Sequence, residues 1–253
     1  MSWYSRQHAV VTGGGSGIGA AIAEDLVNTG AMVTIMGRGE VRLKATAKRI
    51  GAACEVCDVT DRSSVAKAFA AARSANGRIS ILVNNAGTAE AMPFAKMQDE
   101  FWDRLLSVNL DGVFNCTRAV AGEMLDAKSG RIVNIGSTAS LKGYAYIAAY
   151  CAAKHGVLGL TRALALEFAS QGVTVNAVCP GYTNTDIVDN AIDKIMSATG
   201  RSRDEAMAEL VKANPQGRLV EPSEVASTVR WLCDESSGSI TGQAIAVAGG
   251  EVM

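Results

Sequence analysis

Short runs of residues that favour β-strands alternate with longer helical patterns along the whole of the 253-residue chain. Such alternation indicates repeated strand, helix, strand units, in which parallel strands form one sheet and helices cover both of its faces. The predicted strands are residues 8–12, 32–36, 54–57, 81–84, 131–135, 174–179 and 244–247. We therefore predict an α/β fold with a doubly wound, seven-stranded parallel sheet.

No linker interrupts this pattern, and α/β folds often reach this length as one domain, so a single domain is predicted for residues 1–253. Residues 183–214 depart from the alternation because they carry two short helical patterns separated by Gly200. Ser202 stands three residues before Glu205, which is the spacing of a helix capping box. The segment follows a strand's carboxyl end, where doubly wound sheets bind ligands, so we interpret it as a short helical substrate lid.

The charge balance argues against two classes of partner. The formal net charge is -1 and the pI is about 6.2, so no excess of positive charge is available for a nucleic-acid backbone or an anionic membrane. No apolar stretch approaches the roughly 18 to 20 residues that a membrane-spanning helix needs. The first predicted strand begins at His8, which leaves no room for a secretory leader, so we expect a cytoplasmic protein.

The six cysteines are expected to be structural. They are spread through a chain with a large apolar core, so no disulfide framework is required. Cys54 and Cys57 form a C-x-x-C pattern, but residues three apart in a strand face opposite sides. No second C-x-x-C or histidine pair completes a zinc site, so no metal is predicted.

A glycine-rich turn follows the first predicted strand and opens a helical pattern at Ala20. Glycines let the backbone turn sharply and approach a pyrophosphate, while a helix N-terminus offers free N–H groups and positive dipole charge. The spacing Gly-x-x-x-Gly-x-Gly differs from the general G-x-G-x-x-G fingerprint, and a lone turn of this kind also serves as a plain connection. The predicted contacts of a dinucleotide here are Gly13, Ser16, Gly17, Ile18 and Gly19.

Tyr150 and Lys154 are four residues apart in residues 150–171, which are predicted to form one long helix, so both side chains share a face. An unperturbed phenol has a pKa of about 10, too high for a base near neutrality. A neighbouring ammonium stabilises the phenolate, so Lys154 is expected to lower the pKa of Tyr150. Ser137 ends the fifth predicted strand and is expected to reach the same crevice.

These three side chains predict carbonyl chemistry. Ser137 would polarise the carbonyl, Tyr150 would give it a proton, and a nicotinamide would deliver hydride to the carbon. Each residue alone has an ordinary interpretation, as a turn serine, a helix tyrosine or a solvated lysine. His155 is adjacent to Lys154, but neighbouring helix positions point about 100° apart, and His8 opens the first strand, so both histidines are expected to be structural.

From Val10 to Gly250 the chain resembles the short-chain dehydrogenase/reductase family, whose fold is a single Rossmann domain. The matching motifs are the glycine-rich turn, Asp58-Val59, Asn84-Asn85-Ala86-Gly87, Asn109, Ser137, Tyr150 with Lys154, and Pro180-Gly181. The resemblance implies a catalytic set of Asn109, Ser137, Tyr150 and Lys154, in which Asn109 holds a water that relays protons between Lys154 and solvent. It also implies a homotetramer formed through the long helices.

The same resemblance implies the cofactor contacts. Asp58 and Val59 would contact adenine, and Lys154 would also bind the nicotinamide ribose. The other residues implied to line the cofactor cleft or to flank the nicotinamide are Asn85, Ala86, Gly87, Tyr150, Pro180, Gly181, Thr183 and Thr185.

The end of the second predicted strand bears on which cofactor binds. Dinucleotide folds that select NAD place there an acidic residue that binds the adenosine ribose. This chain has Gly37 followed by Arg38, whose guanidinium matches a 2′-phosphate by charge and geometry. NADP is therefore favoured, and NAD is the alternative because NADP-preferring relatives often carry a second basic residue in the glycine-rich turn, where this chain has Ser16.

The lid and the residues after it resemble those of 3-oxoacyl-thioester and polyketide ketoreductases, so a small carbonyl or alcohol substrate linked to coenzyme A or a carrier is expected. Hydroxybutyrate dehydrogenases of the family place glutamine and histidine where this chain has Ala89 and Ala139, which argues against a small free hydroxy acid. Two alternatives stay open: a dehydrogenase of another cyclic, sterol, sugar or aromatic alcohol, and a non-catalytic NAD(P)-binding regulatory protein. The complete catalytic set disfavours the second.

Overall fold

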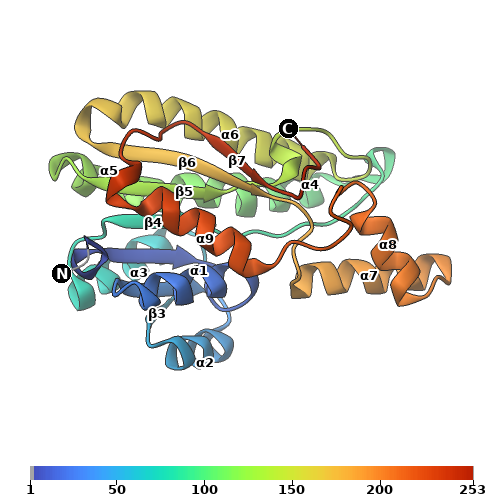
Figure 1. The fold of residues 1–253 in the computed structure, drawn as a ribbon, viewed down its shortest axis with the longest axis horizontal. Coiled ribbons are helices and arrows are strands. Elements are labelled where there is room, and N and C mark those ends of the chain that lie inside the picture. Colours follow the sequence, from blue (N-terminus) through green and yellow to red (C-terminus); the bar gives the residue numbers. More distant parts are fainter. Residues whose placement is uncertain (1–2, 253) are drawn as a thin grey trace.

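The computed structural model describes residues 3–252, and its sheet has seven parallel strands in the order β3-β2-β1-β4-β5-β6-β7 (Figure 1). The strands are β1 (His8–Thr12), β2 (Met32–Gly37), β3 (Ala53–Val56), β4 (Ile81–Asn84), β5 (Gly130–Ile135), β6 (Val173–Pro180) and β7 (Ala244–Val247). The predicted doubly wound parallel sheet is confirmed, and each strand end lies within one residue of its predicted position.

The central strands are buried on both faces, which explains why their sequences are almost continuously apolar instead of alternating. Every residue of β1, β4, β5 and β6 is buried, whereas the edge strands β3 and β7 are only partly buried. The sheet therefore separates two apolar layers.

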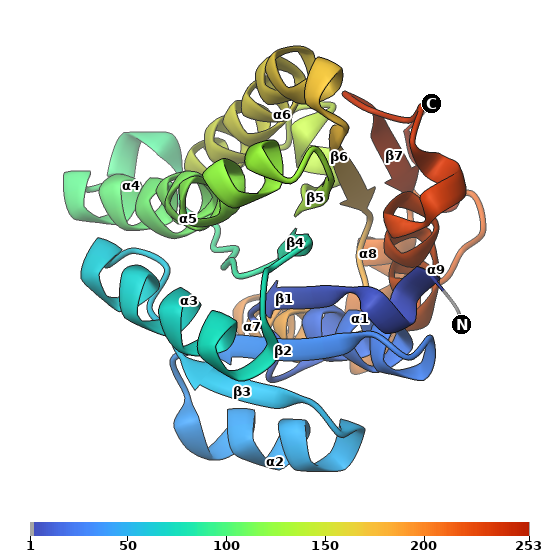
Figure 2. The same ribbon diagram turned by 90° about the vertical axis from the view of Figure 1, so that its left-hand side faces the viewer.

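Helices cover both faces of the sheet (Figure 2). On one face, α1 (Gly17–Asn28), α2 (Glu40–Ile50) and α9 (Pro222–Cys233) share a core cluster with the strands. On the other face, a second cluster is shared by α3 (Arg62–Asn76), α5 (Gly112–Asp126) and α6 (Ala148–Phe168). Helix α4 (Asp99–Leu106) packs against α6 through Phe101, Leu105 and Ala149.

The winding of the sheet reverses between β1 and β4. Strand β1 pairs with both β2 and β4, so the chain adds strands outward in opposite directions from this point. The carboxyl ends of the two strands form the crevice in which open α/β sheets bind ligands. Thr12, the last residue of β1, holds the crevice together because its Oγ1 accepts hydrogen bonds of 3.0 Å from the N–H groups of Asn85 and Ala86.

A buried polar network joins the sheet to α5 and α6. Asn84 Nδ2 donates to Asn134 Oδ1 (2.8 Å) and to Thr117 Oγ1 (3.0 Å). Asn134 Nδ2 in turn donates to Thr161 Oγ1 (2.9 Å), and all four side chains are buried. These bonds fix the position of α6, whose first turns carry the predicted tyrosine and lysine, relative to β4 and β5.

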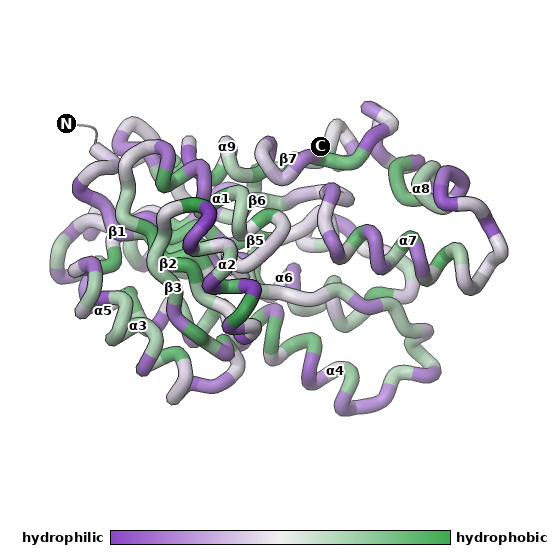
Figure 3. The backbone as a smooth tube through the Cα atoms, turned by 90° about the horizontal axis from the view of Figure 1, so that it is seen from below, coloured by the Kyte–Doolittle hydropathy of each residue, from purple (hydrophilic) through white to green (hydrophobic). Residues whose placement is uncertain are grey.

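Two helices follow β6 in the segment predicted as a lid, α7 (Asp186–Thr199) and α8 (Arg203–Val211). The Ser202 hydroxyl accepts from the Glu205 N–H, and the Glu205 carboxylate accepts from the Ser202 N–H (2.8 Å), so the predicted capping box is confirmed. The two helices pack on each other through an apolar cluster of their own. They project beyond the carboxyl ends of the strands (Figure 3).

The six cysteines are all free thiols. Cys54 packs against the layer of α1, α2 and α9, and Cys57 lies in the opposite layer, so their predicted opposite orientation is confirmed. Among residues 3–252, no three His, Cys, Asp or Glu side chains gather in the way that a metal site requires.

The two histidines lie apart from the predicted site. The ring nitrogens of the buried His8 are 2.9 Å from Gly77 O and from Thr34 Oγ1, and His155 is exposed on α6. In the described part of the chain, no helix is both long and apolar enough to cross a membrane.

Candidate active site

The glycine-rich turn has glycine where a larger residue would collide or be strained. Gly13 (φ +65°) and Gly17 (φ +52°) both have left-handed backbone conformations. A Cβ atom on Gly19 would lie 2.4 Å from Gly13 O. Helix α1 begins at Gly17 with Ser16 as its N-cap, so the N–H groups of its first turn, which includes Ile18, are offered to an anion at the turn.

A cavity of about 430 Å³ opens between this turn and the end of β2. The residues that line it are Gly13, Gly15, Ser16, Gly37, Arg38, Gly39, Arg42 and Leu43. In this fold the adenosine ribose of a dinucleotide lies at the end of the second strand, where the two arginines supply positive charge. These residues fit a dinucleotide, because the glycines allow close approach to a pyrophosphate and the guanidinium groups match a phosphate.

Asp58 and Val59, the predicted adenine contacts, follow β3. The Asp58 carboxylate accepts hydrogen bonds from the N–H (3.0 Å) and the hydroxyl (2.8 Å) of Thr60, which lower the pKa of Asp58, and the nearby Arg38 guanidinium adds to this effect. The buried Val59 accepts at its carbonyl a hydrogen bond of 3.0 Å from Asn115 Nδ2 on α5. The structure thus brings both residues to the same edge of the sheet as Arg38.

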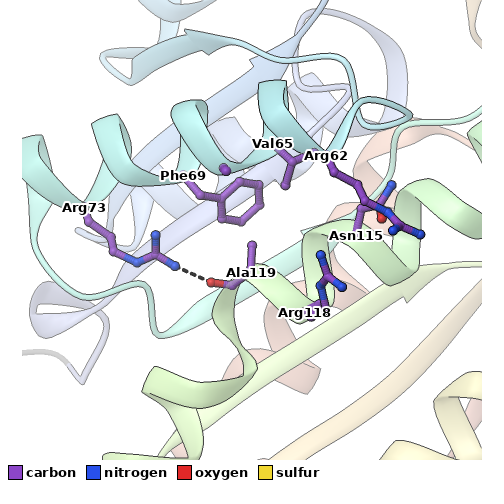
Figure 4. A pocket seen from close by; sticks show the side chains of 8 residues that line it. Arg62, Val65, Phe69, Arg73, Asn115, Arg118 and Ala119 are labelled. Atoms are coloured by element: carbon purple, nitrogen blue, oxygen red, sulfur yellow. Dashed lines mark hydrogen bonds between the residues drawn. The ribbon is translucent and has the colours of Figure 1, made fainter.

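A second hollow lies between α3 and α5 (Figure 4). Its lining residues are Arg62, Val65, Ala66, Phe69, Arg73, Asn115, Arg118 and Ala119. Arg73 is tied to α5 by hydrogen bonds to the Ala119 carbonyl and to Glu123 Oε1 (3.0 Å). The predicted site residues are not among those that line it, so it bears on the site only through Asn115.

Lys154 is buried near the start of α6. Its Nζ donates a hydrogen bond of 2.7 Å to Ile135 O, at the end of β5. Burial lowers the pKa of Lys154 to about 8, because removal of an ammonium from water disfavours its charged form. The amine lies 5.6 Å from the centre of the Tyr150 ring, so the two side chains share one face of the helix as predicted.

Burial raises the pKa of Tyr150 to about 12, and a hydrogen bond with the Ser137 side chain offsets part of the rise. The net shift of the Tyr150 pKa is therefore upward, opposite to the predicted lowering. The ammonium donates to the Ile135 carbonyl, and the loss of hydration around the phenol dominates. Tyr150 consequently keeps its proton at neutral pH, as a general acid must.

Ser137 follows β5 directly and caps the short 3₁₀ turn Thr138–Ser140. Its Oγ accepts a hydrogen bond from the Ala139 N–H (3.1 Å), and its own N–H donates to Ser140 Oγ (3.2 Å). Neither bond uses the Ser137 hydroxyl proton, which is therefore available for donation, here to the Tyr150 oxygen and otherwise to a carbonyl oxygen.

Asn109 is fully buried in a π-helical segment, Ser107–Asp111, between α4 and α5. Its Nδ2 donates to Thr88 O (2.9 Å), and its Oδ1 accepts from the Thr88 N–H (3.2 Å). A Cβ atom on Gly87 would lie 2.8 Å from Asn109 Oδ1 and 3.8 Å from Lys154 Nζ. Glycine at this position therefore keeps space between two of the predicted catalytic residues.

The chain beyond β6 leads from the sheet to the segment predicted as a lid. Pro180 ends β6, and Gly181 donates its N–H to the end of β7 (3.0 Å). Thr183 forms an isolated parallel bridge to the residues before α9. Thr185 occupies the N-cap position of α7, and its Cγ2 lies 3.1 Å from the position of a Cβ on Gly17. The residues predicted to flank the nicotinamide thus run from the sheet to the glycine-rich turn.

Arg42 was missed by the sequence analysis. It lines the same cavity as Arg38, lies four residues further on in the first turn of α2, and has its Nη1 3.0 Å from Asp186 Oδ2 at the start of α7. The signal in the sequence was a second arginine four residues after the first, on a predicted helix.

A buried carboxylate near the end of the chain was also missed. Glu251 is ion-paired with Lys142 (3.1 Å) and accepts a hydrogen bond from the Tyr144 hydroxyl, which is itself 2.7 Å from Thr138 Oγ1. Burial and the Glu251 carboxylate raise the pKa of Tyr144. This group braces the turn that holds Ser137, and no local sequence pattern indicates a contact between residues so far apart.

The family model of the short chain dehydrogenases matches residues 7–195, which is more than half of the chain. The chain therefore belongs to this family and is an oxidoreductase that acts on CH–OH or carbonyl groups with a nicotinamide cofactor. The family predicted from the sequence is confirmed.

Individual relatives extend over nearly the whole chain. An acetoacetyl-CoA reductase of Rhizobium meliloti is 40% identical over 96% of this chain and 97% of its own. The 3-oxoacyl-[acyl-carrier-protein] reductase FabG of Salmonella typhimurium is 37% identical over 97% of both chains. A crystal structure of a tryptophan variant of actinorhodin polyketide ketoreductase with NADPH is 39% identical, covers 99% of both chains and has a TM-score of 0.94.

Proposed function

We propose that the chain is an NADPH-dependent reductase of 3-oxoacyl thioesters. The observation that carries the proposal is the convergence of Ser137, Tyr150 and Lys154 at the adjoining ends of β5 and α6, on the same carboxyl edge of the parallel sheet as a cavity lined by arginines. The relatives named as reductases of acetoacetyl-CoA and of 3-oxoacyl carrier proteins support the thioester as substrate.

The residues around the crevice would hold the cofactor. The glycine-rich turn and the first turn of α1 would bind the pyrophosphate through N–H groups, and Lys154 would bind the nicotinamide ribose. When bound, the nicotinamide supplies the hydride. The further contacts included in the proposal, on their position around this cleft, are Asp58, Val59, Asn85, Ala86, Gly87, Pro180, Gly181, Thr183 and Thr185.

The chain's own groups move the proton. Tyr150, with a pKa of about 12, is protonated at neutral pH and gives its proton to the ketone oxygen as the carbonyl becomes CH–OH. The Ser137 hydroxyl donates a hydrogen bond to the same oxygen and stabilises the negative charge that develops on it. Charged Lys154 stabilises the phenolate that remains, and the space at Gly87 lets a water on Asn109 return the proton.

Arg38 supports NADPH over NADH. It lies at the end of β2, where a carboxylate would be required to bind an unmodified ribose, and its guanidinium lines the cavity. The structural neighbour that was solved with NADPH also supports NADPH as the cofactor.

The substrate proposal is tested by the loss of reduced-cofactor absorbance when the purified protein meets acetoacetyl-coenzyme A, with NADPH and NADH in parallel. We expect turnover with NADPH. Turnover with NADH alone would overturn the cofactor assignment, and cofactor binding without turnover would overturn the thioester.

Two tyrosine variants test the acid. Tyr150→Phe removes the proton donor, so the rate should fall by about 10²-fold or more. Tyr146→Phe is the matched control, because Tyr146 is 65% exposed, and its rate should stay near that of the unmodified protein. Equal rates for Tyr150→Phe and the control would refute the role of Tyr150.

We also infer a homotetramer built through α5 and α6, and a cytoplasmic location. The tetramer is supported by large apolar side chains exposed on these helices, Phe114 (40% exposed) and Leu166 (85% exposed). Light scattering coupled to size-exclusion chromatography measures the assembly, and a monomer would contradict it.

A further inference from the structure

Arg42 contacts two parts of the molecule, the cavity at the glycine-rich turn and the predicted lid. It lies in the first turn of α2, and with Arg38 it lines the cavity beside the glycine-rich turn. Its Nη1 also binds Asp186 Oδ2 (3.0 Å), and Asp186 is the first residue of α7 in the predicted lid. One guanidinium therefore joins the cavity to the lid.

A second contact shows that the lid's base lies directly over the turn. The Thr185 methyl carbon is 3.1 Å from the place that a Cβ on Gly17 would occupy. Thr185 caps α7 and Gly17 begins α1, so the first turns of the two helices meet. A ligand at the turn therefore lies next to the Arg42–Asp186 ion pair.

The ion pair is weak enough to be exchanged. The side chains of Arg42 and Asp186 are 65% and 67% exposed, and exposed pairs contribute about 0–1 kcal/mol. A phosphate monoester carries nearly two negative charges near pH 7 and accepts bidentate hydrogen bonds from a guanidinium, so it competes well with one carboxylate.

The other charged groups near α2's first turn have partners of their own. Glu40 is paired with Lys44 (2.6 Å), and the Asp58 carboxylate is bound by Thr60. Among the described residues, Arg38 forms no ion pair within 4.0 Å, although its guanidinium is near enough to Asp58 to help lower the pKa of that carboxyl. The cavity therefore presents Arg38 freely and Arg42 through an exchangeable pair.

We propose that Arg42 is a second ligand of the cofactor's 2′-phosphate, and that the phosphate takes the guanidinium from Asp186 and so releases the first turn of the lid. The inference rests on the proposed preference for NADPH. It couples the identity of the cofactor to the segment that would admit the substrate.

Binding of cofactor fragments tests the ligand half without any turnover. Adenosine 2′,5′-bisphosphate and adenosine 5′-monophosphate differ only in the 2′-phosphate, and titration calorimetry on the full chain gives both affinities. Arg42→Gln should weaken binding of the bisphosphate about tenfold and leave the monophosphate within about twofold. Arg49→Gln, on the same helix and paired with Glu24 (2.8 Å), is the matched control and should change neither affinity.

Removing the charge of Asp186, which competes with the phosphate for Arg42, tests whether the guanidinium changes partner. Asp186→Asn should tighten binding of the bisphosphate about threefold, and this gain should vanish when Arg42→Gln is also present. Hydrogen exchange at the first turn of α7 should rise with the bisphosphate and not with the monophosphate. An unchanged affinity in Asp186→Asn, or equal exchange with both nucleotides, would overturn the release of the lid.

The outcomes separate this inference from the proposed function. If the unmodified protein binds both nucleotides equally, the NADPH preference and the role of Arg42 both fail. If it prefers the bisphosphate, and Arg38→Gln removes the preference while Arg42→Gln does not, only the role of Arg42 fails.

Discussion

Replacing Gly19 with alanine tests the close packing at the start of α1. The new Cβ would lie 2.4 Å from both Gly13 O and Asn85 Nδ2. Both atoms must shift, so the turn must move and Asn85 must give up the hydrogen bonds that it donates to the carbonyls of Thr12 (2.9 Å) and Gly13 (3.2 Å). Two lost bonds cost about 2 kcal/mol and overpacking about 1–3 kcal/mol, so we expect the free energy of unfolding to fall by about 3–5 kcal/mol.

Thermal unfolding followed by circular dichroism measures this loss. The entropy of unfolding is about 2.1 cal/mol/K per residue, so the expected loss lowers Tm by about 6–9 °C for a chain of this length. Gly15→Ala is the control from the same turn, because its Cβ would be 3.7 Å from the nearest atom, and its Tm should change by about 1 °C or less. A Gly19→Ala protein with the same Tm as the Gly15→Ala control would refute the reasoning.

Three further predictions concern charge and buried polarity. Because the pKa of Lys154 is about 8, kcat/KM for NADPH should fall as pH rises through that value, and Lys154→Arg should remove this limb of the pH profile. Asn134→Ala removes one of the two buried partners of the Asn84 amide and the donor to Thr161, so urea unfolding should show a loss of about 2–4 kcal/mol, and a loss below about 1 kcal/mol would contradict the network. Arg218→Gln breaks two short bonds to Glu224 (2.7 and 2.8 Å), yet the pair is exposed, so stability should fall by under about 1 kcal/mol in the same assay.

The strands of the sheet were predictable because each is indicated by the residues of its own short segment. Strands that are buried on both faces have continuous apolar sequences, and β1 and β6 are buried along their whole length. The glycine-rich turn and the Tyr150–Lys154 pair are equally local, since each lies within one turn or one helix. Their positions in the fold therefore agree with those inferred from spacing alone.

The electrostatics of the site were not predictable in this way. The sequence places an ammonium near a phenol, but the backbone carbonyl that binds Lys154 comes from Ile135, on another element. Burial of the phenol reverses the expected direction of the Tyr150 pKa shift. Arg42 and Asp186 are separated by 144 positions, and such contacts depend on how helices pack after the sheet has formed.

The π-helical segment Ser107–Asp111 ties the proposed role of Asn109 to the exact number of residues in this helix. A π turn holds one more residue than an α turn, so loss of a single codon there would restore a continuous α-helix from α4 to α5. Successive residues of an α-helix are rotated by about 100° around the helix axis, so α4 would rotate by that amount relative to α5. Asn109 would then lose its hydrogen bonds to Thr88. If Asn109 has its proposed role, a descendant gene with this one-residue deletion would encode an intact nucleotide-binding fold without catalysis, and alignment gaps at 107–111 are where such inactive relatives should be sought.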